Sequence, residues 1–448
     1  MVFILHKNSG VMKKLFFGCF LFISALLNAQ SLIYSGPMNG YSEMRETLIW
    51  VQMTEPCIVE LVYWVDSLPD QTFKSIPVAA DPEKALTAHL IADNVEPGTR
   101  YGYAIHADGE NQLEGRALYF KTQELYQYRK DPSEFTIAIG SCAYINEPEY
   151  DRPGKAYGRT YDIFERIADL KPDMMLWLGD NIYLREADYF SRTGILKRYT
   201  HSRHLPELQR LLSATHHYAI WDDHDYGPND ANWTYPHKDK TLEAFKLFWG
   251  NNGYGTNDLG GITSAFQFND LHFYLLDNRW WRTDANLVTS DERMLGDAQI
   301  EWLIQSLKYS KAPFKFIAVG SQILNTQKIY ENYANYEDER EELLDRIAAE
   351  GIKGVIFLTG DRHHSELNRY EHNGTILYEI TSSPLSSGSP PIENEGNENL
   401  MEGTLYYDTN FGYLEISGPR TDRKLQISMR DMNGEILYTN EILASEWE

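Results

Sequence analysis

Side chains that bind metals and transfer protons recur along this chain at one kind of position, directly after a short apolar run. The clusters are, in chain order, Gly140-Ser141-Cys142, Gly179-Asp180-Asn181, Asp222-Asp223-His224-Asp225, Asp277-Asn278-Arg279, Gly320-Ser321-Gln322, Gly360-Asp361-Arg362-His363-His364 and Thr381-Ser382-Ser383. Together they offer a thiolate, imidazoles and several carboxylates. A pair of metal ions that activates water needs such a set, because one carboxylate must bridge the ions while other side chains hold each ion separately.

The donor types predict a mixed metal centre. A thiolate with an imidazole suits a transition metal, whereas a set of oxygen ligands suits Ca²⁺ or Mg²⁺. A single Gly-Asp pair after a strand is most often only a turn, and a single cysteine there is most often a core residue. A thiol, four or more acids and a histidine at successive run ends together favour a site.

The apolar runs that precede these clusters are predicted to be strands, and amphipathic segments between them are predicted to be helices. The strands are expected at residues 135–139, 174–178, 218–221, 271–276, 314–319, 355–359 and 376–380, and the helices at 161–170, 205–212, 298–307 and 341–349. Alternation of this kind is typical of an α/β fold with a covered sheet. If the strands are parallel, their carboxyl ends bring the clusters to one edge.

The region before residue 125 has a different pattern. Residues 47–53, 57–65, 100–107 and 115–122 are short runs rich in β-branched and aromatic residues, and turn formers divide them. The stretch around Pro97-Gly98 and Tyr101 resembles the tyrosine corner of fibronectin type III sandwiches. We therefore predict a small all-β domain of fibronectin or immunoglobulin type at residues 31–125, a linker at 130–132, and a second domain at 134–448.

Two further segments complete the prediction for the second domain. Residues 386–402 are rich in Ser, Pro, Asn and Glu, which indicates a flexible loop: either a rim or lid of the site, or a plain surface loop. The alternating runs at 403–417 and 424–440 predict antiparallel strands that complete a second sheet.

Four of the clusters occur in an order that resembles a known family. Gly140-Ser141-Cys142, the run Gly179-Asp180-Asn181-Ile182-Tyr183, Trp221-Asp222-Asp223-His224-Asp225 and Gly360-Asp361-Arg362-His363 are similar to the motifs of PhoD-like alkaline phosphatases in the calcineurin-like metallophosphoesterase superfamily. The resemblance runs from about residue 135 to the carboxyl end. It implies a β-sandwich core flanked by helices, of the metallophosphoesterase type.

The resemblance also implies a metal centre with at least two ions. Fe³⁺ would be held by the residues that match the family's ligands, which are Cys142, Asp180, Tyr183 and His363. Asp180 would bridge to Ca²⁺, whose other ligands would be Asp361 and an oxygen from Asp223 or Asn229. Gln322 stands where many members of the superfamily carry a metal-binding histidine.

Three residues are candidates for a direct part in catalysis. His224 falls where the superfamily places a histidine beside the metals, and it would donate to a phosphoryl oxygen or to the leaving group, with Asp225 fixing its tautomer. Arg279, and with it Arg185, would bind non-bridging phosphate oxygens. The alternative for either arginine is an ion pair with a neighbouring carboxylate.

The predicted activity is hydrolysis of phosphomonoesters or phosphodiesters by in-line attack of metal-activated water or hydroxide. The substrate would be a small phosphoester. A first alternative is a phospholipase or a phosphodiesterase acting on glycan-linked esters, for which a lipid headgroup or glycan would be the substrate. A second alternative is a surface binding protein whose metal site has lost its activity.

Composition and charge limit the other possibilities. The 448 residues carry 41 Lys and Arg against 65 Asp and Glu, a formal charge of −24, which disfavours broad nucleic-acid binding. Lys13 and Lys14 precede an apolar run at 15–27, which predicts a signal peptide over residues 1–29, cleavage near Ala29, and a secreted or periplasmic product. No second run is long enough to cross a membrane.

Two details of the exported chain remain. Cys57 lies in an apolar run and is expected to be a core residue, so that a disulfide with Cys142 is not expected. The basic run at residues 197–204 would either attract the phosphorylated substrate or form an ordinary solvated helix face.

Overall fold

The computed structural model describes residues 31–391 and 395–447, so that the predicted signal peptide lies outside the described residues. Among the described residues, no helix is long and apolar enough to cross a membrane. Both Cys57 and Cys142 are buried free thiols.

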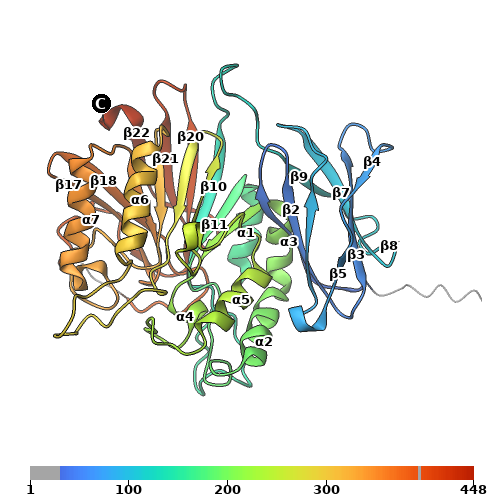
Figure 1. Ribbon diagram of the computed structural model, residues 1–448, viewed down its shortest axis with the longest axis horizontal. Coiled ribbons are helices and arrows are strands. Elements are labelled where there is room, and N and C mark those ends of the chain that lie inside the picture. The colour runs from blue at the N-terminus through green and yellow to red at the C-terminus, as the bar shows by residue number, and fades with distance from the viewer. Residues whose placement is uncertain (1–30, 392–394, 448) are drawn as a thin grey trace, which may run out of the picture. The chain divides into compact units, whose positions relative to one another are not determined.

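Two large sheets carry the predicted strands (Figure 1). The nine-stranded sheet has the order β22 (Ile436–Leu443), β21 (Lys424–Asp431), β20 (Asn410–Ser417), β10 (Phe135–Gly140), β11 (Met174–Leu178), β12 (His216–Ile220), β1 (Ile33–Ser42), β2 (Thr47–Met53), β6 (Thr87–Ala92). The seven-stranded sheet has the order β13 (Ser264–Phe268), β14 (Leu271–Leu275), β15 (Lys315–Ala318), β16 (Val355–Thr359), β18 (Thr375–Thr381), β17 (His364–His372), β19 (Tyr406–Tyr407). All seven strands predicted to precede the clusters are present within two residues of the predicted bounds.

The central strands of each sheet are parallel, as the prediction of convergent clusters required. Strand β10 pairs with β11 and β11 with β12 in parallel, and β14, β15, β16 and β18 pair in parallel in the other sheet. Their carboxyl ends therefore lie at one edge of each sheet.

The two sheets pack face to face around one hydrophobic core. Apolar side chains of the first sheet, such as Ile139 and Leu176, belong to the same buried cluster as Phe273, Phe316 and Leu358 of the second. The β-sandwich core flanked by helices is confirmed. Close contact at the site edge depends on small residues, since a Cβ on Gly360 would lie 2.6 Å from the Ser141 side chain.

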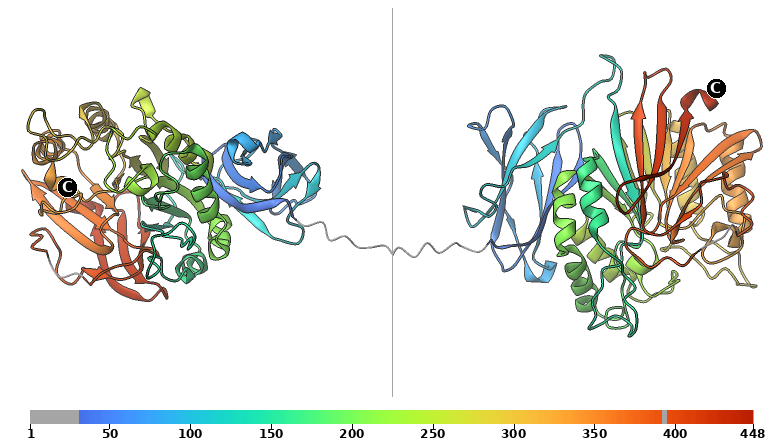
Figure 2. Two further views of the ribbon diagram at one scale, coloured as in Figure 1. Left: turned by 90° about the horizontal axis from the view of Figure 1, so that it is seen from below. Right: turned by 180° about the vertical axis from the view of Figure 1, so that it is seen from behind.

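Helices cover the outer faces of both sheets (Figures 1 and 2). The longer helices are α1 (Asp162–Leu170), α2 (Arg192–Arg203), α3 (Pro206–Ala214), α5 (Lys238–Phe248), α6 (Asp297–Tyr309) and α7 (Glu337–Ala349), and α4 (Asp223–Tyr226) is a single turn. Helices α6 and α7 pack through Ile300, Leu303 and Leu343 against the outer face of the seven-stranded sheet. The four predicted helices are confirmed, whereas α2, α4 and α5 were not predicted.

The amino-terminal region divides its strands between two sheets. A six-stranded sheet holds β4 (Thr72–Lys74), β3 (Ile58–Val65), β7 (Arg100–Ala107) and β8 (Glu110–Asn111), with β5 (Val78–Ala79) on β3 and β9 (Leu118–Lys121) on β7. The predicted tyrosine corner is present, because the Glu96 amide donates to the Tyr101 hydroxyl at 2.8 Å. However, β1, β2 and β6 extend the sheet that contains β12, and the division into two domains at residues 125–134 stays a prediction.

The carboxyl-terminal strands are antiparallel as predicted, but their predicted sheet was wrong. Strand β20 pairs with β10, so that β20, β21 and β22 extend the first sheet and complete no second one (Figures 1 and 2). Their alternating pattern fixed the pairing type, whereas the partner strand depends on contacts far along the chain.

Candidate metal centre

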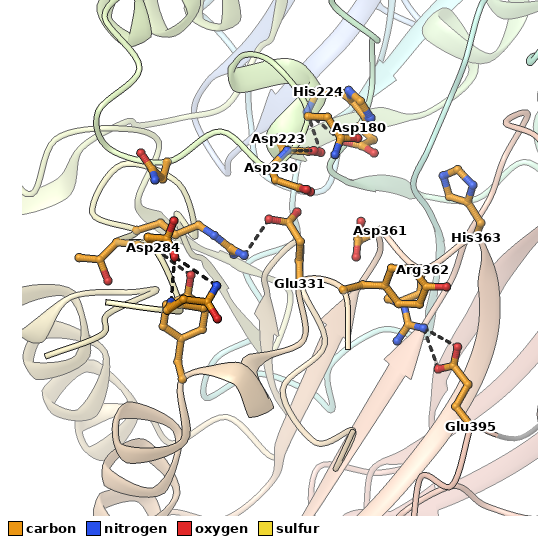
Figure 3. A pocket seen from close by; sticks show the side chains of 18 of the residues that line it. Asp180, Asp223, His224, Asp230, Asp284, Glu331, Asp361, Arg362, His363 and Glu395 are labelled. Atoms are coloured by element: carbon orange, nitrogen blue, oxygen red, sulfur yellow. Dashed lines mark hydrogen bonds and ion pairs between the residues drawn. The ribbon is translucent and has the colours of Figure 1, made fainter. Parts of the chain in front are cut away.

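A cavity of about 880 Å³ opens where the carboxyl ends of the parallel strands of the two sheets meet. Its polar walls come from both sheets and from the loops between their strands (Figure 3). The predicted site residues among its lining are Asp180, Asp223, His224, Asn229, Asp361 and His363. The strand ends therefore bring together the side chains that the sequence placed far apart.

Four of the predicted ligands form one group at the inner wall. The Cys142 Sγ lies 3.7 Å from Asp180 Oδ2, and the Tyr183 hydroxyl lies 3.2 Å from His363 Nε2. Cys142 is fully buried and Tyr183 is nearly so. The other ring nitrogen of His363, Nδ1, lies 2.7 Å from the Gly388 carbonyl oxygen, to which it donates, and this leaves Nε2 with its lone pair directed at the group.

Asp180 is shared by a second group of donors. One of its carboxylate oxygens faces Cys142, and the other accepts from the His224 amide at 3.3 Å. Ligand atoms of Cys142, Asp180 and His363 lie within 4.8 Å of one another, and so do those of Asp180, Asp223 and His224. A carboxylate in both groups is the arrangement that a bridge between two cations requires.

The backbone is strained at four of the predicted ligands. Cys142, Asp180, Asp361 and His363 have φ values of 57°, 51°, 63° and 55°, in the left-handed region that residues with a Cβ seldom adopt. Each such residue costs about 1 kcal/mol or more, and strain of this kind concentrates at functional sites. The turns after the strands therefore hold these side chains at the strand ends at a cost in stability.

The charge of the cavity favours bound cations. Burial, and then repulsion by Asp223 and Asp222, raises the pKa of Asp180 well above its usual value, and burial with Glu331 does the same for the pKa of Asp361. The Asp361 carboxylate accepts no hydrogen bond from any described residue. Bound cations would offset the negative charge of these buried carboxylates, so the residues fit a centre of two metal ions.

Asp361 and Asn229 occupy different parts of the cavity wall. In Figure 3, Asp361 is drawn between Arg362 and the group of Asp180 and Asp223, and all of them line the same cavity. Asn229 lines the cavity from the exposed turn after α4. Both the Asp223 and the Asn229 candidates therefore face the same space.

Asp225 makes no hydrogen bond to the His224 ring in this structure. Its carboxylate accepts from the backbone amides of Asn181 and Asp222 at 3.1 Å, and it also accepts from the Asn181 side chain. The Nδ1 atom of His224 is buried and has no hydrogen-bond partner among the described residues. Successive side chains on a helical turn point in different directions, so Asp225 holds the loop and leaves the His224 ring unpaired.

Arg279 is paired with buried carboxylates, which is the alternative expected for this arginine. Its guanidinium is fully buried, donates through Nε to Asp222 at 2.6 Å and through NH1 to Glu331 at 2.7 Å, and is paired through NH2 with both acids. No donor is left for a phosphate oxygen. Arg185 is not among the residues that line the cavity, and it packs over the rings of Tyr144 and Tyr183.

Other polar residues of the site came from loops that carry no strand-end signal. Glu331 and Arg282 line the cavity and form an ion pair of 2.7 Å, and the Tyr157 hydroxyl lies 3.2 Å from His363 Nδ1. Gln322 is buried against Glu366, Thr381 and Arg362 and faces away from the donor groups. The sequence contains no periodic pattern from which Glu331, Arg282 and Tyr157 could have been predicted as site residues.

Comparisons with known proteins agree with this geometry. Residues 137–425 match the family of PhoD-like phosphatases. Over 355 residues the chain is 26% identical to alkaline phosphatase D of Bacillus subtilis, a stretch that covers 68% of this chain. The chain spans only 57% of the length of that relative.

Two solved structures share the fold. A structure of PhoD is similar with a TM-score of 0.73 at 18% identity, covering 93% of this chain and 90% of that one. A purple acid phosphatase from yellow lupin (Lupinus luteus) seeds is similar with a TM-score of 0.64 at 13% identity, covering 92% and 74% of the two chains.

Proposed function

Because the chain belongs to the PhoD-like phosphatase family, we propose that it is an exported, metal-dependent hydrolase of phosphate esters. The observation that carries this proposal is the Asp180 carboxylate, which belongs to two groups of potential ligands in one cavity. A site with one bridging carboxylate and two sets of terminal ligands is suited to phosphoester hydrolysis.

The donor chemistry favours a different class of ion in each group, and the family resemblance implies which ions these are. Fe³⁺ would be held by Cys142, Asp180, Tyr183 and His363, since thiolate, phenolate and imidazole favour a transition metal. Ca²⁺ would be held by the oxygens of Asp180 and Asp361, with Asp223 or Asn229 completing the set. When bound, the ions supply Lewis acidity toward the phosphate and lower the pKa of a water nucleophile.

The protein's own side chains would orient the ester and manage its charge. His224 lines the cavity, so its ring is placed to donate to a phosphoryl or leaving-group oxygen. Arg282 also lines the cavity, whereas Arg279 does not, which makes Arg282 the better candidate for contact with the ester.

The size of the cavity favours esters with two organic groups. A volume of about 880 Å³ is within the range that holds whole drug-sized ligands, and it greatly exceeds the space that one phosphoryl group needs. Phosphodiesters are therefore the favoured substrates, and lipid headgroups or glycan-linked esters are among the diesters that fit.

The experiment that tests the proposal combines metal analysis with two aryl esters. Freshly purified protein should contain iron and calcium and should hydrolyse bis(4-nitrophenyl) phosphate faster than 4-nitrophenyl phosphate. Cys142→Ala should lose both iron and activity, because the thiolate is one of four proposed iron ligands. The matched control is Cys57→Ala, which removes a buried thiol from the core of the β-rich region and should keep iron and activity.

Two results would contradict the proposal. Iron retained in full by Cys142→Ala would exclude this residue as a ligand. A protein that binds both metals but hydrolyses neither ester would favour the alternative of a surface binding protein with an inactive metal site.

A further inference from the structure

The serine-rich segment at residues 382–389, which follows β18, surrounds the four proposed iron ligands. Ser383 Oγ donates to Cys142 Sγ at 3.1 Å, Ser387 Oγ lies 2.9 Å from the Tyr183 hydroxyl, and the Gly388 carbonyl accepts from His363. Both serines are fully buried. One short segment thus touches three of the four ligands, although it includes none of them.

The hydroxyl proton of Ser383 is directed at sulfur by its surroundings. The backbone amide of His363 donates to Ser383 Oγ at 3.0 Å, which occupies the oxygen as an acceptor. The hydroxyl proton is then left for the Cys142 sulfur, which becomes a charged acceptor once a metal binds it. Main-chain hydrogen bonds hold the segment in place, from Ser382 to Thr359 at 3.0 Å and from Leu385 to Ser141 at 2.8 Å.

The hydroxyl of Ser387 has two neighbouring acceptors, and the surroundings favour one of them. It lies 2.9 Å from the Cys142 carbonyl oxygen and 2.9 Å from the Tyr183 hydroxyl. The Cys142 carbonyl already accepts from the backbone amides of Ser386 at 3.2 Å and Ser387 at 3.1 Å. A metal-bound phenolate can only accept, and its charge makes it the stronger acceptor, so the Ser387 proton goes to Tyr183.

We propose that Ser383 and Ser387 are positioning residues that set the electronic state of the bound iron through its thiolate and phenolate ligands. The inference rests on the proposed function, because it requires iron at Cys142 and Tyr183. A hydrogen bond to a ligand atom withdraws electron density from it, and hydrogen bonds to ligand sulfur raise reduction potentials. Iron that receives less electron density is also the stronger Lewis acid toward a phosphate oxygen.

The test uses the light absorption and the reduction potential of the purified, metal-loaded protein. Loss of a hydrogen bond makes a ligand easier to oxidise, so the charge-transfer band of that ligand moves to longer wavelength and the midpoint potential of the iron falls. Ser383→Ala should shift the thiolate band and Ser387→Ala the phenolate band, at unchanged iron content. Ser383→Thr, which keeps the hydroxyl, should restore the position found in the unmodified protein.

Ser386→Ala is the matched control because it removes a fully buried hydroxyl of the same segment. Ser386 Oγ donates to the Tyr144 carbonyl at 3.0 Å and touches no ligand side chain, so this variant should keep both bands and the potential. Unshifted bands in Ser383→Ala and Ser387→Ala with iron retained would overturn the proposal. Equal shifts in Ser386→Ala would also overturn it, because they would show a general loosening of the segment.

The failure of the proposed function gives a different result. Unmodified protein without iron would contradict the iron assignment and not the serine contacts. The same variants would then be compared in Co²⁺-loaded protein, where the thiolate band should shift in Ser383→Ala alone. An unshifted cobalt band in that variant would overturn the role of Ser383 independently of iron.

Discussion

Arg279 is expected to stabilise the folded protein through its buried ion pairs with Asp222 and Glu331, rather than to bind phosphate. Arg279→Met removes the charge and keeps a side chain of similar length. Asp222 then keeps one side-chain donor, Asn278 at 3.0 Å, while Glu331 keeps Arg282. A buried carboxylate loses its compensating charge in a place where water cannot replace it.

The expected loss is large for one substitution. The side chains of Arg279, Asp222 and Glu331 are 0%, 1% and 7% exposed, so both ion pairs are buried. Removal of one partner of a buried pair typically costs about 3 to 5 kcal/mol. The matched control is Arg346→Met in α7, because Arg346 pairs with Glu301 at the surface, where the two side chains are 31% and 52% exposed. An exposed pair is worth about 0 to 1 kcal/mol.

The assay is urea-induced unfolding followed by tryptophan fluorescence, with the same saturating metal concentrations for each variant because bound metal stabilises the folded state. A double variant, Arg279→Met with Glu331→Met, should lose less than the sum of the single variants, since it removes both members of one pair. The reasoning would be refuted if Arg279→Met lost less than about 1 kcal/mol. A raised KM at unchanged stability would restore the direct contact with phosphate.

Two other predictions concern the core and the site edge. Burial lowers the pKa of His217 to about 3, so the stabilisation that depends on its neutral ring is complete above pH 6.5 and is lost as the pH falls. Relative to His217→Gln, the unmodified protein should lose about 2 kcal/mol of unfolding free energy between pH 7.5 and 5.0. A difference in unfolding free energy between the two proteins that stays constant over this pH range would contradict the prediction. A Cβ on Gly320 would lie 2.3 Å from Asp222 Cγ, so Gly320→Ala should lower the unfolding free energy by about 1 to 3 kcal/mol and reduce the metal content. The control is Gly253→Ala, whose Cβ would meet only Ser264 at 3.9 Å and which should change neither quantity. If Gly320→Ala matched this control in metal content and stability, the site edge would be shown to relax around the added methyl group.

The parts of the fold that the sequence predicted are those in which local pattern and tertiary environment agree. The parallel strands are buried and mostly apolar, as in Met174–Leu178 and Val355–Thr359, because both of their faces are covered. The polar residue after the run must then lie at the carboxyl edge of the sheet. Given parallel strands, these two facts place Cys142, Asp180 and Asp361 at the carboxyl edges of their sheets.

The parts that it missed have patterns that tertiary contacts override. Helix α2 buries Arg198 and Arg203, so it has no apolar stripe, and the basic run 197–204 is no open basic surface. Arg198 pairs with Asp188, and Arg203 packs over the ring of Trp249. The strand β1, with the sequence IYSGPMNGYS, contains the residues that usually mark a turn.

The segment 386–402 illustrates the same limit at the site. Its composition indicated a flexible loop, yet Ser386 and Ser387 at its start are fully buried against the strand ends. Small hydroxyl side chains suit a flexible loop and a tight polar interior equally well. Only the contacts with Cys142 and Tyr183 distinguish the two cases.

The contact between Ser383 and Cys142 joins residues 241 positions apart, and it has a consequence for biosynthesis. The ligands Cys142 and Asp180 leave the ribosome long before Asp361 and His363. They also precede Ser383 and Ser387, which contact the side chains of Cys142 and Tyr183. A nascent chain that ends before residue 360 lacks His363 for the iron and Asp361 for the calcium. Uptake of the ions should therefore be among the last events in maturation. The bound ions would then link the segment that contains Cys142 and Asp180 to the segment that contains Asp361 and His363.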